Sequence, residues 1–156
     1  MSTSITLTVN GTDYPVTIDP SRNLVSVLRT EIGLTGTKEG CDDCECGACM
    51  VLIDGQPVNS CSYLAVQAAD RAIMTVEGVM SGDELHPLQQ ALLDEGGVQC
   101  GFCTPGMIMS ATALRSRNAS PTEVEVRIGL SGNLCRCTGY VKILAAVQRA
   151  AAEATS

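Results

Sequence analysis

Hydrophobic and polar positions alternate in the first half of the chain, as expected of strands. Residues 4–10 and 14–18 alternate on either side of Asn10-Gly11, a typical turn sequence, which predicts an antiparallel hairpin. Three further strands and one helix are predicted from shorter hydrophobic runs, at residues 50–53, 58–60, 73–76 and 24–32 respectively. This half is therefore predicted to be a small mixed sheet with one helix packed on it.

The spacing of hydrophobic residues becomes helical after about Glu77, and residues 78–83 resemble a linker. Four helices are predicted, over residues 87–93, 104–116, from 121 onward, and from 140 to the C-terminus. Thr104 and Ser120 each precede a proline and are the predicted N-caps of two of them. His86, the one histidine, precedes Pro87 and is expected to cap a helix or lie on the surface.

This change in pattern predicts an α+β chain with two domains, residues 1–78 and residues 79–156. Hydrophobic residues make up 45% of the chain but aromatic residues only 3%, so both cores must be aliphatic. Two small aliphatic cores are marginally stable alone, and metal–thiolate bonds would offset that deficit.

The net charge of −7 and the lack of a basic cluster argue against a nucleic-acid partner. No run approaches the ~20 apolar residues that a membrane span requires. The N-terminus lacks the basic and apolar regions of a secretory signal, so we expect a cytoplasmic protein. Nine cysteines in a reducing compartment favour metal binding over disulfides.

Eight of these cysteines form two quartets with different spacings. The first quartet is Cys41-x4-Cys46-x2-Cys49-x11-Cys61. Its x4, x2 spacing is typical of plant-type [2Fe–2S] proteins, whereas structural zinc sites usually show two short cysteine pairs. The first quartet is therefore predicted to hold a [2Fe–2S] cluster, with zinc or disulfides as alternatives. The ninth cysteine, Cys44, is interpreted as a spectator thiol, with an alternate ligand as the other reading.

The second quartet is Cys100-x2-Cys103-x31-Cys135-x-Cys137, within two connections between predicted helices. Cys103 directly precedes a predicted helix, where N–H groups and the helix dipole favour a thiolate. Cys137 precedes the last predicted helix in the same way. Spacing alone indicates a metal site here, and zinc stays open as an alternative.

Three stretches around these cysteines match one family: Gly40-Cys41 with Glu45-Cys46-Gly47-Ala48-Cys49, Gln99-Cys100-Gly101-Phe102-Cys103-Thr104-Pro105-Gly106, and Gly132-Asn133-Leu134-Cys135-Arg136-Cys137-Thr138-Gly139-Tyr140. With them the chain resembles the small iron–sulfur subunit of the molybdenum hydroxylases, the xanthine oxidase family. The resemblance covers about residues 4–150, and the last two motifs are the more specific ones.

The resemblance implies a plant-type ferredoxin β-grasp domain followed by a four-helix domain, each with one [2Fe–2S] cluster. It also implies a molybdopterin-binding large subunit, and an FAD-binding medium subunit or a cytochrome as the next electron carrier. Gln99 and Cys137 would lie at the pterin edge, with Cys137 also a ligand. The chain would then be the non-catalytic, electron-transfer subunit of an oxidoreductase. A complex exported on a partner's signal would be periplasmic.

The chain departs from the family at Asp43 and Cys44, where glycine is usual. If these positions need a positive φ, both side chains are strained there. The carboxylates of Asp42, Asp43 and Glu45 are expected to make the first cluster harder to reduce. Two other functions stay open on the residues alone: a stand-alone two-cluster ferredoxin or redox sensor, and a zinc-stabilised interaction module.

Overall fold

The first half of the chain folds into a five-stranded mixed sheet. The computed structural model describes residues 1–80, 82 and 84–153. The strands are β1 (Thr3–Val9), β2 (Thr12–Ile18), β3 (Met50–Ile53), β4 (Gln56–Asn59) and β5 (Ala72–Met74), in the spatial order β2-β1-β5-β3-β4. β1 runs parallel to β5, and the other neighbours are antiparallel. The predicted β1–β2 hairpin is thereby confirmed, and β3 and β4 form a second hairpin.

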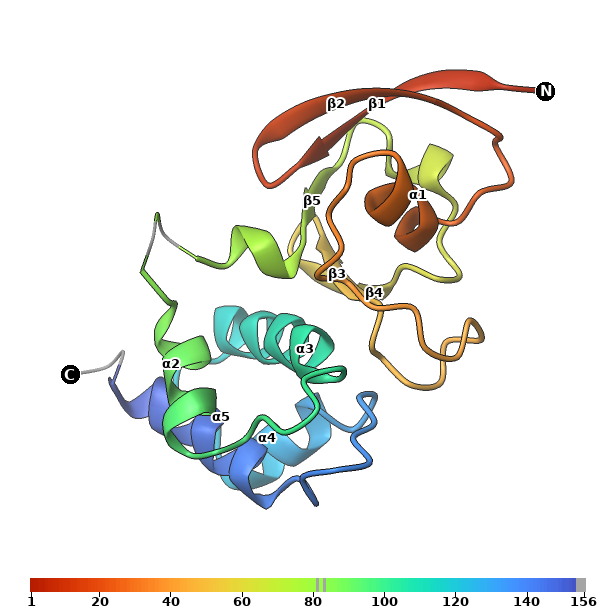
Figure 1. Ribbon diagram of the computed structural model, residues 1–156. Coiled ribbons are helices and arrows are strands. Elements are labelled where there is room, and N and C mark those ends of the chain that lie inside the picture. The colour runs from red at the N-terminus through yellow and green to blue at the C-terminus, as the bar shows by residue number, and fades with distance from the viewer. Residues whose placement is uncertain (81, 83, 154–156) are drawn as a thin grey trace.

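Helix α1 (Leu24–Thr30) covers one face of this sheet (Figure 1). The helix begins after Asn23, whose side-chain oxygen accepts a hydrogen bond from the Ser26 N–H at 3.0 Å and so caps the first turn. The aliphatic core between helix and sheet contains Leu7, Val9, Ile18, Leu24, Val27, Leu28, Val51, Ile53, Ala65, Ala68 and Ile73. This core lies wholly within the first half of the chain.

The second half contains the helices α2 (Pro87–Asp94), α3 (Thr104–Arg117), α4 (Glu123–Gly129) and α5 (Val141–Glu153). Figure 1 shows them as one group beside the sheet, with α3 nearest to β3 and β4. Their shared core includes Leu88, Leu92, Met107, Met109, Val126, Ile143 and Val147. Leu52 of β3 also belongs to this core, because side chains alternate along a strand and Leu52 faces away from the α1 side. The central sheet therefore contacts α1 on one face and the helices of the second half on the other.

Two predicted N-caps were wrong by one or two residues. Helix α4 is capped by Thr122, not Ser120, because Thr122 and Glu125 form the reciprocal capping box. The N-cap position of helix α3 is Cys103, whose side chain makes no capping hydrogen bond, and Thr104 is the first helical residue. The predicted linker begins at Gly78, the end of a short 3-10 helix (Val76–Gly78), but its residues 81 and 83 lie outside the described residues, as do residues 154–156. Within the described chain, no helix has the length and apolar character to cross a membrane.

His86 caps helix α2, which gives a prediction about pH. Its Nδ1 accepts from the Leu88 N–H at 3.1 Å, and burial, assisted by the charge of Arg115, lowers the pKa of His86 from 6.5. A lowered folded-state pKa stabilises the fold above pH 6.5, and this stabilisation is lost as the pH falls through the folded-state pKa. His86→Asn keeps a capping oxygen but does not titrate. We therefore expect the stability of the wild type, relative to His86→Asn, to fall between pH 7.5 and pH 5 in urea titrations. A constant difference would contradict this role.

Candidate metal centres

The eight quartet cysteines come together as four interacting thiol pairs. The pairs are Cys41–Cys46 and Cys49–Cys61 in the first quartet, and Cys100–Cys137 and Cys103–Cys135 in the second. In the described part of the chain, no three His, Cys, Asp or Glu side chains close around one point that a single ion could occupy. A [2Fe–2S] cluster shares four thiolates between two irons, which is two for each iron. Two pairs in each quartet are thus the donor set that such a cluster needs.

The loop of the first quartet turns sharply through left-handed residues. Asp42, Cys44 and Gly47 have φ values of 59°, 67° and 68°. Asp43 is not among them, so the strain expected for a side chain at residue 43 falls on Asp42 instead. These turns direct backbone N–H groups at sulfur, and the Cys46 N–H donates to the Cys41 Sγ at 3.3 Å. Such N–H donors stabilise the negative charge of a thiolate-bound cluster.

Burial and pairing give the thiols of the first quartet unequal proton affinities. Burial and a hydrogen bond to Cys49 raise the pKa of Cys61 to about 12. The Asp43 carboxylate acts to raise the pKa of Cys41, but the backbone N–H groups of Asp43 and Cys46 outweigh it and the pKa is lowered. Its partner Cys46 has a pKa that is raised, chiefly by burial. Metal binding to such pairs must displace protons, because the thiolate is the ligand.

The second quartet is carried by the start of α3 and by the loop before α5. Cys103 lies at the start of α3, as predicted, but as the N-cap residue in place of Thr104, whereas Cys137 is separated from α5 by Thr138, Gly139 and Tyr140. In this loop the Thr138 Oγ1 donates to the Cys135 Sγ at 3.1 Å. Burial raises the pKa of Cys103 to about 12, so desolvation outweighs the favourable helix start. Burial would also raise the pKa of Cys135, but hydrogen bonds from the Thr138 hydroxyl and backbone bring it to about 7.

Comparison with known proteins gives the family. A model of the [2Fe–2S] binding domain matches residues 75–148. The small FeS subunit of nicotinate dehydrogenase from Eubacterium barkeri is 49% identical over 147 residues, which cover 94% of each chain. The iron–sulfur-binding subunit of xanthine dehydrogenase from Escherichia coli O157:H7 is 48% identical over 143 residues, covering 90% of this chain and 89% of that one. This chain belongs to the small iron–sulfur subunits of the molybdenum hydroxylases.

Solved structures agree with this membership. Quinoline 2-oxidoreductase from Pseudomonas putida 86 superposes with a TM-score of 0.95 at 44% identity, covering 99% of this chain and 96% of that one. The aldehyde oxidoreductase of Desulfovibrio desulfuricans superposes with a TM-score of 0.94 at 42% identity, but the match covers only 17% of its chain. The predicted family, the α+β class and the electron-transfer role as a non-catalytic subunit are confirmed. A stand-alone ferredoxin is not favoured, since the relatives are named as subunits.

The small iron–sulfur subunit has a seam between its two cysteine loops that sequence reasoning missed. The Leu134 N–H donates to the Cys46 carbonyl at 2.9 Å, and the Asn133 Nδ2 donates to the Gly47 carbonyl at 3.0 Å. Asn133 is 2% exposed, and its Oδ1 accepts from the Ser110 hydroxyl of α3 at 2.6 Å. We call residues 46–47 with residues 133–134 the inter-loop seam. The sequence carried no signal for this seam, because its hydrogen bonds join groups of two separate loops.

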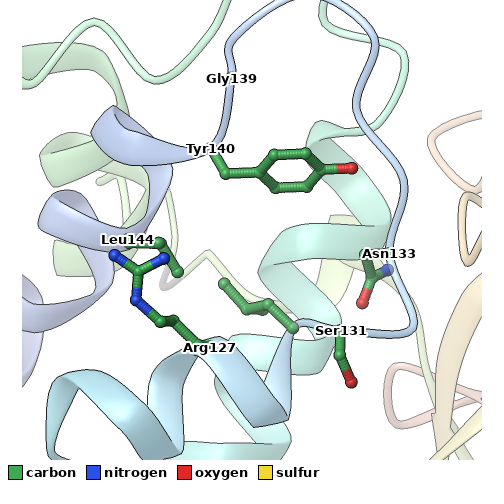
Figure 2. Close-up of a pocket in the computed structure, with 7 residues that line it drawn as sticks. Arg127, Ser131, Asn133, Gly139, Tyr140 and Leu144 are labelled. Carbon is green, nitrogen blue, oxygen red and sulfur yellow. The ribbon is translucent and has the colours of Figure 1, made fainter.

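The exposed side of the second quartet is formed by one thiol pair. Cys100 and Cys137 are exposed and lie 3.5 Å apart, Sγ to Sγ, whereas Cys103 and Cys135 are partly buried. Gln99, adjacent to Cys100, is exposed as well. The structure thus places Gln99 and Cys137, the two predicted pterin-edge residues, on one surface. Next to the loop that precedes α5 lies a pocket of about 280 Å³, lined by Tyr140, Asn133, Arg127 and neighbouring residues (Figure 2).

Cys44 lies against Cys61 rather than in either pair of the first quartet. Its thiol and backbone N–H both contact the Cys61 sulfur, and its carbonyl accepts from the Asn59 Nδ2 at 3.1 Å. Its φ of 67° places a non-glycine side chain in the left-handed region. The residue is exposed, so the thiol adds little buried surface. This position suits glycine better than cysteine.

Cys44→Gly is therefore expected to stabilise the protein. Relief of left-handed strain, about 1–2 kcal/mol, exceeds the entropy cost of glycine, so we expect a net gain of about 0.5–1 kcal/mol. Iron content and both iron–sulfur EPR signals should be unchanged. Cys44→Ala is the matched control, because it removes the thiol and keeps the strain. Loss of the first-quartet signal in both variants would make Cys44 a ligand instead.

Proposed function

We propose that the chain relays electrons from a molybdopterin site in a large partner subunit, through two [2Fe–2S] clusters, to FAD or another acceptor. The observation that carries this proposal is the inter-loop seam between two sets of paired thiols. Cys46 is a candidate ligand, and its carbonyl accepts from the N–H of Leu134, the residue before Cys135. Covalent bonds and one 2.9 Å hydrogen bond thus connect the two quartets, as an internal relay requires.

We assign one cluster to each quartet. The ligands are Cys41, Cys46, Cys49 and Cys61 for the first cluster, and Cys100, Cys103, Cys135 and Cys137 for the second. Paired thiols and inward-directed N–H groups support this assignment, as does the small side chain of Ala48 next to Cys49. When bound, each cluster supplies a site for one electron. Glycine at residue 40 also suits a cluster at the first quartet, because a Cβ there would lie 3.0 Å from the Cys46 Sγ.

The two clusters belong to two proposed domains. Residues 1–78 would form a plant-type ferredoxin β-grasp domain, and residues 79–156 a four-helix domain. Two separate aliphatic cores support this division, and the [2Fe–2S] binding domain model covers the second of them. The two cores are not fully separated by this division, because the side chain of Leu52 on β3 packs into the helical core.

Exposure supports the proposed direction of electron flow. Cys100, Cys137 and Gln99 form an exposed edge that suits a pterin bound in a large subunit. The first cluster would then pass electrons to an FAD-binding medium subunit or to a cytochrome. The aldehyde oxidoreductase relative supports a large partner, because most of its chain lies beyond the segment that matches this one. We expect the complex to be cytoplasmic unless a partner carries an export signal.

Metal analysis of the complex tests this function. Two clusters predict about four Fe and about four sulfide per chain, with molybdenum and a larger subunit purifying together with the chain. Zinc without sulfide would refute the cluster assignment. Two clusters in a chain that purifies alone, with no molybdenum, would instead support a stand-alone ferredoxin.

A further inference from the structure

Tyr140 has a strained backbone at the entrance to α5. Its φ is 70°, directly after Gly139 at 64°, so two successive residues are left-handed. A bulky side chain in this region is a genuine outlier and persists only where surrounding contacts hold it. The Tyr140 ring packs on the helical core, and Figure 2 shows it extending from the start of α5 towards the segment that carries Asn133. Contacts close to Tyr140 must therefore hold its backbone in this strained conformation.

The contacts that hold Tyr140 form a closed ring of hydrogen bonds around Cys135. The Tyr140 Oη accepts from the Cys135 N–H at 2.8 Å. The Tyr140 N–H donates to the Thr138 Oγ1 at 3.3 Å, and this hydroxyl donates its own proton to the Cys135 Sγ at 3.1 Å. Tyr140 thus holds Cys135 at both its backbone and, through Thr138, its sulfur. The left-handed turn lets one residue reach both points.

We infer that Tyr140 is a positioning residue that sets the reduction potential of the second cluster, by holding the Thr138 hydroxyl on the Cys135 sulfur. A hydrogen bond to a cluster sulfur stabilises the reduced, more negative state and raises the potential. The inference rests on the proposed function, since it needs a cluster at the second quartet.

The ring also distinguishes the second quartet from the first. Across the described residues, no hydroxyl donates to a sulfur of the first quartet, where the Asp43 carboxylate instead lies at Cys41. A hydroxyl donor raises a potential, whereas a nearby carboxylate lowers it. Thr138 and Tyr140 therefore act on the electron's distribution between the two clusters.

Redox titration of the assembled complex, with each cluster followed by its EPR signal, tests this inference. Thr138→Val removes the hydroxyl and keeps the shape. It is expected to lower the midpoint of the second cluster alone, by about 59 mV for a tenfold shift of the electron towards the first cluster. Thr138→Ser restores a hydroxyl and is expected to restore the potential. Tyr140→Phe removes only the acceptor and should shift the same midpoint in the same direction, by less. Tyr14→Phe in β2 is the control and should shift neither midpoint.

The outcomes separate this inference from the proposed function. A wild-type complex without iron–sulfur signals would refute both. Wild-type signals with an unshifted second cluster in Thr138→Val, at full iron content, would refute the inference alone, as would equal shifts of both clusters. If Tyr140→Phe fails to assemble, Thr138→Val and Thr138→Ser still decide whether the hydroxyl that the Tyr140 N–H holds sets the potential, because neither changes the strained residue.

Discussion

Replacement of Gly47 by alanine is expected to open the inter-loop seam and to abolish stable cluster assembly. A Cβ at this residue would lie 2.3 Å from the Gly132 carbonyl oxygen and 2.6 Å from the Asn133 Nδ2. The nearer atom belongs to the backbone and cannot move aside without shifting the loop of the second quartet. Gly47 also has a φ of 68°, which adds left-handed strain. Overpacking and strain together are expected to lower the free energy of unfolding by about 3–5 kcal/mol.

Gly55→Ala is the matched control for this prediction. Gly55 has a φ of 77° in the β3–β4 turn, but a Cβ there would meet no atom within 4 Å. The Gly55→Ala variant therefore introduces left-handed strain without a close contact. It should lower the free energy of unfolding by only about 1–2 kcal/mol. Thermal unfolding and iron content measure both variants. Equal losses would show that the contact between the loops contributes nothing beyond local strain.

Replacement of Cys103 by alanine should remove the second cluster and leave the first. Cys103 pairs with Cys135 at the start of α3, so its loss would deprive the proposed second cluster of one ligand. Metal binding contributes directly to folding where the core is small, and this helical core is aliphatic. We expect a loss of several kcal/mol, which is a fall in Tm of about 10 °C or more.

The matching variant in the first quartet is Cys49→Ala, whose thiol pairs with Cys61. It should remove the first EPR signal and spare the second. If either alanine variant removed both signals equally, the quartets would not be separate cluster sites. Retention of both signals in Cys103→Ala, with full iron and sulfide, would exclude Cys103 as a ligand.

The sequence predicted the elements well where a local pattern determines them. Met50–Ile53 is a strand at the predicted bounds, because its hydrophobic run ends at the Asp54-Gly55 turn. The cap of α4 was misplaced because Ser120-Pro121 and Thr122 both suit a helix start. Only the side-chain contact between Thr122 and Glu125 decides between them. Local patterns thus define an element more reliably than its first residue.

Contacts between distant residues could not be predicted from a single chain. Cysteine spacing indicated which thiols share a quartet, but not that Cys103 faces Cys135, since the pairing depends on how the two loops approach. The seam between Gly47 and Asn133 gave no periodic signal, because it depends on backbone groups of two separate loops. The left-handed conformation of Tyr140 was missed for a related reason, since its contacts with Cys135 and Thr138 form only in the folded loop.

The inter-loop seam also has a consequence for the order of folding. Asn133 and Gly47 are 86 positions apart in the chain, and their hydrogen bond closes a loop that contains the end of the first half and most of the second. Closing a long loop costs entropy before its contacts form, so such contacts tend to appear late. The sheet and the helices are thus expected to form first, each from contacts within its own half. The seam would then close last, and the electronic connection between the two quartets would be completed only in the final step of folding.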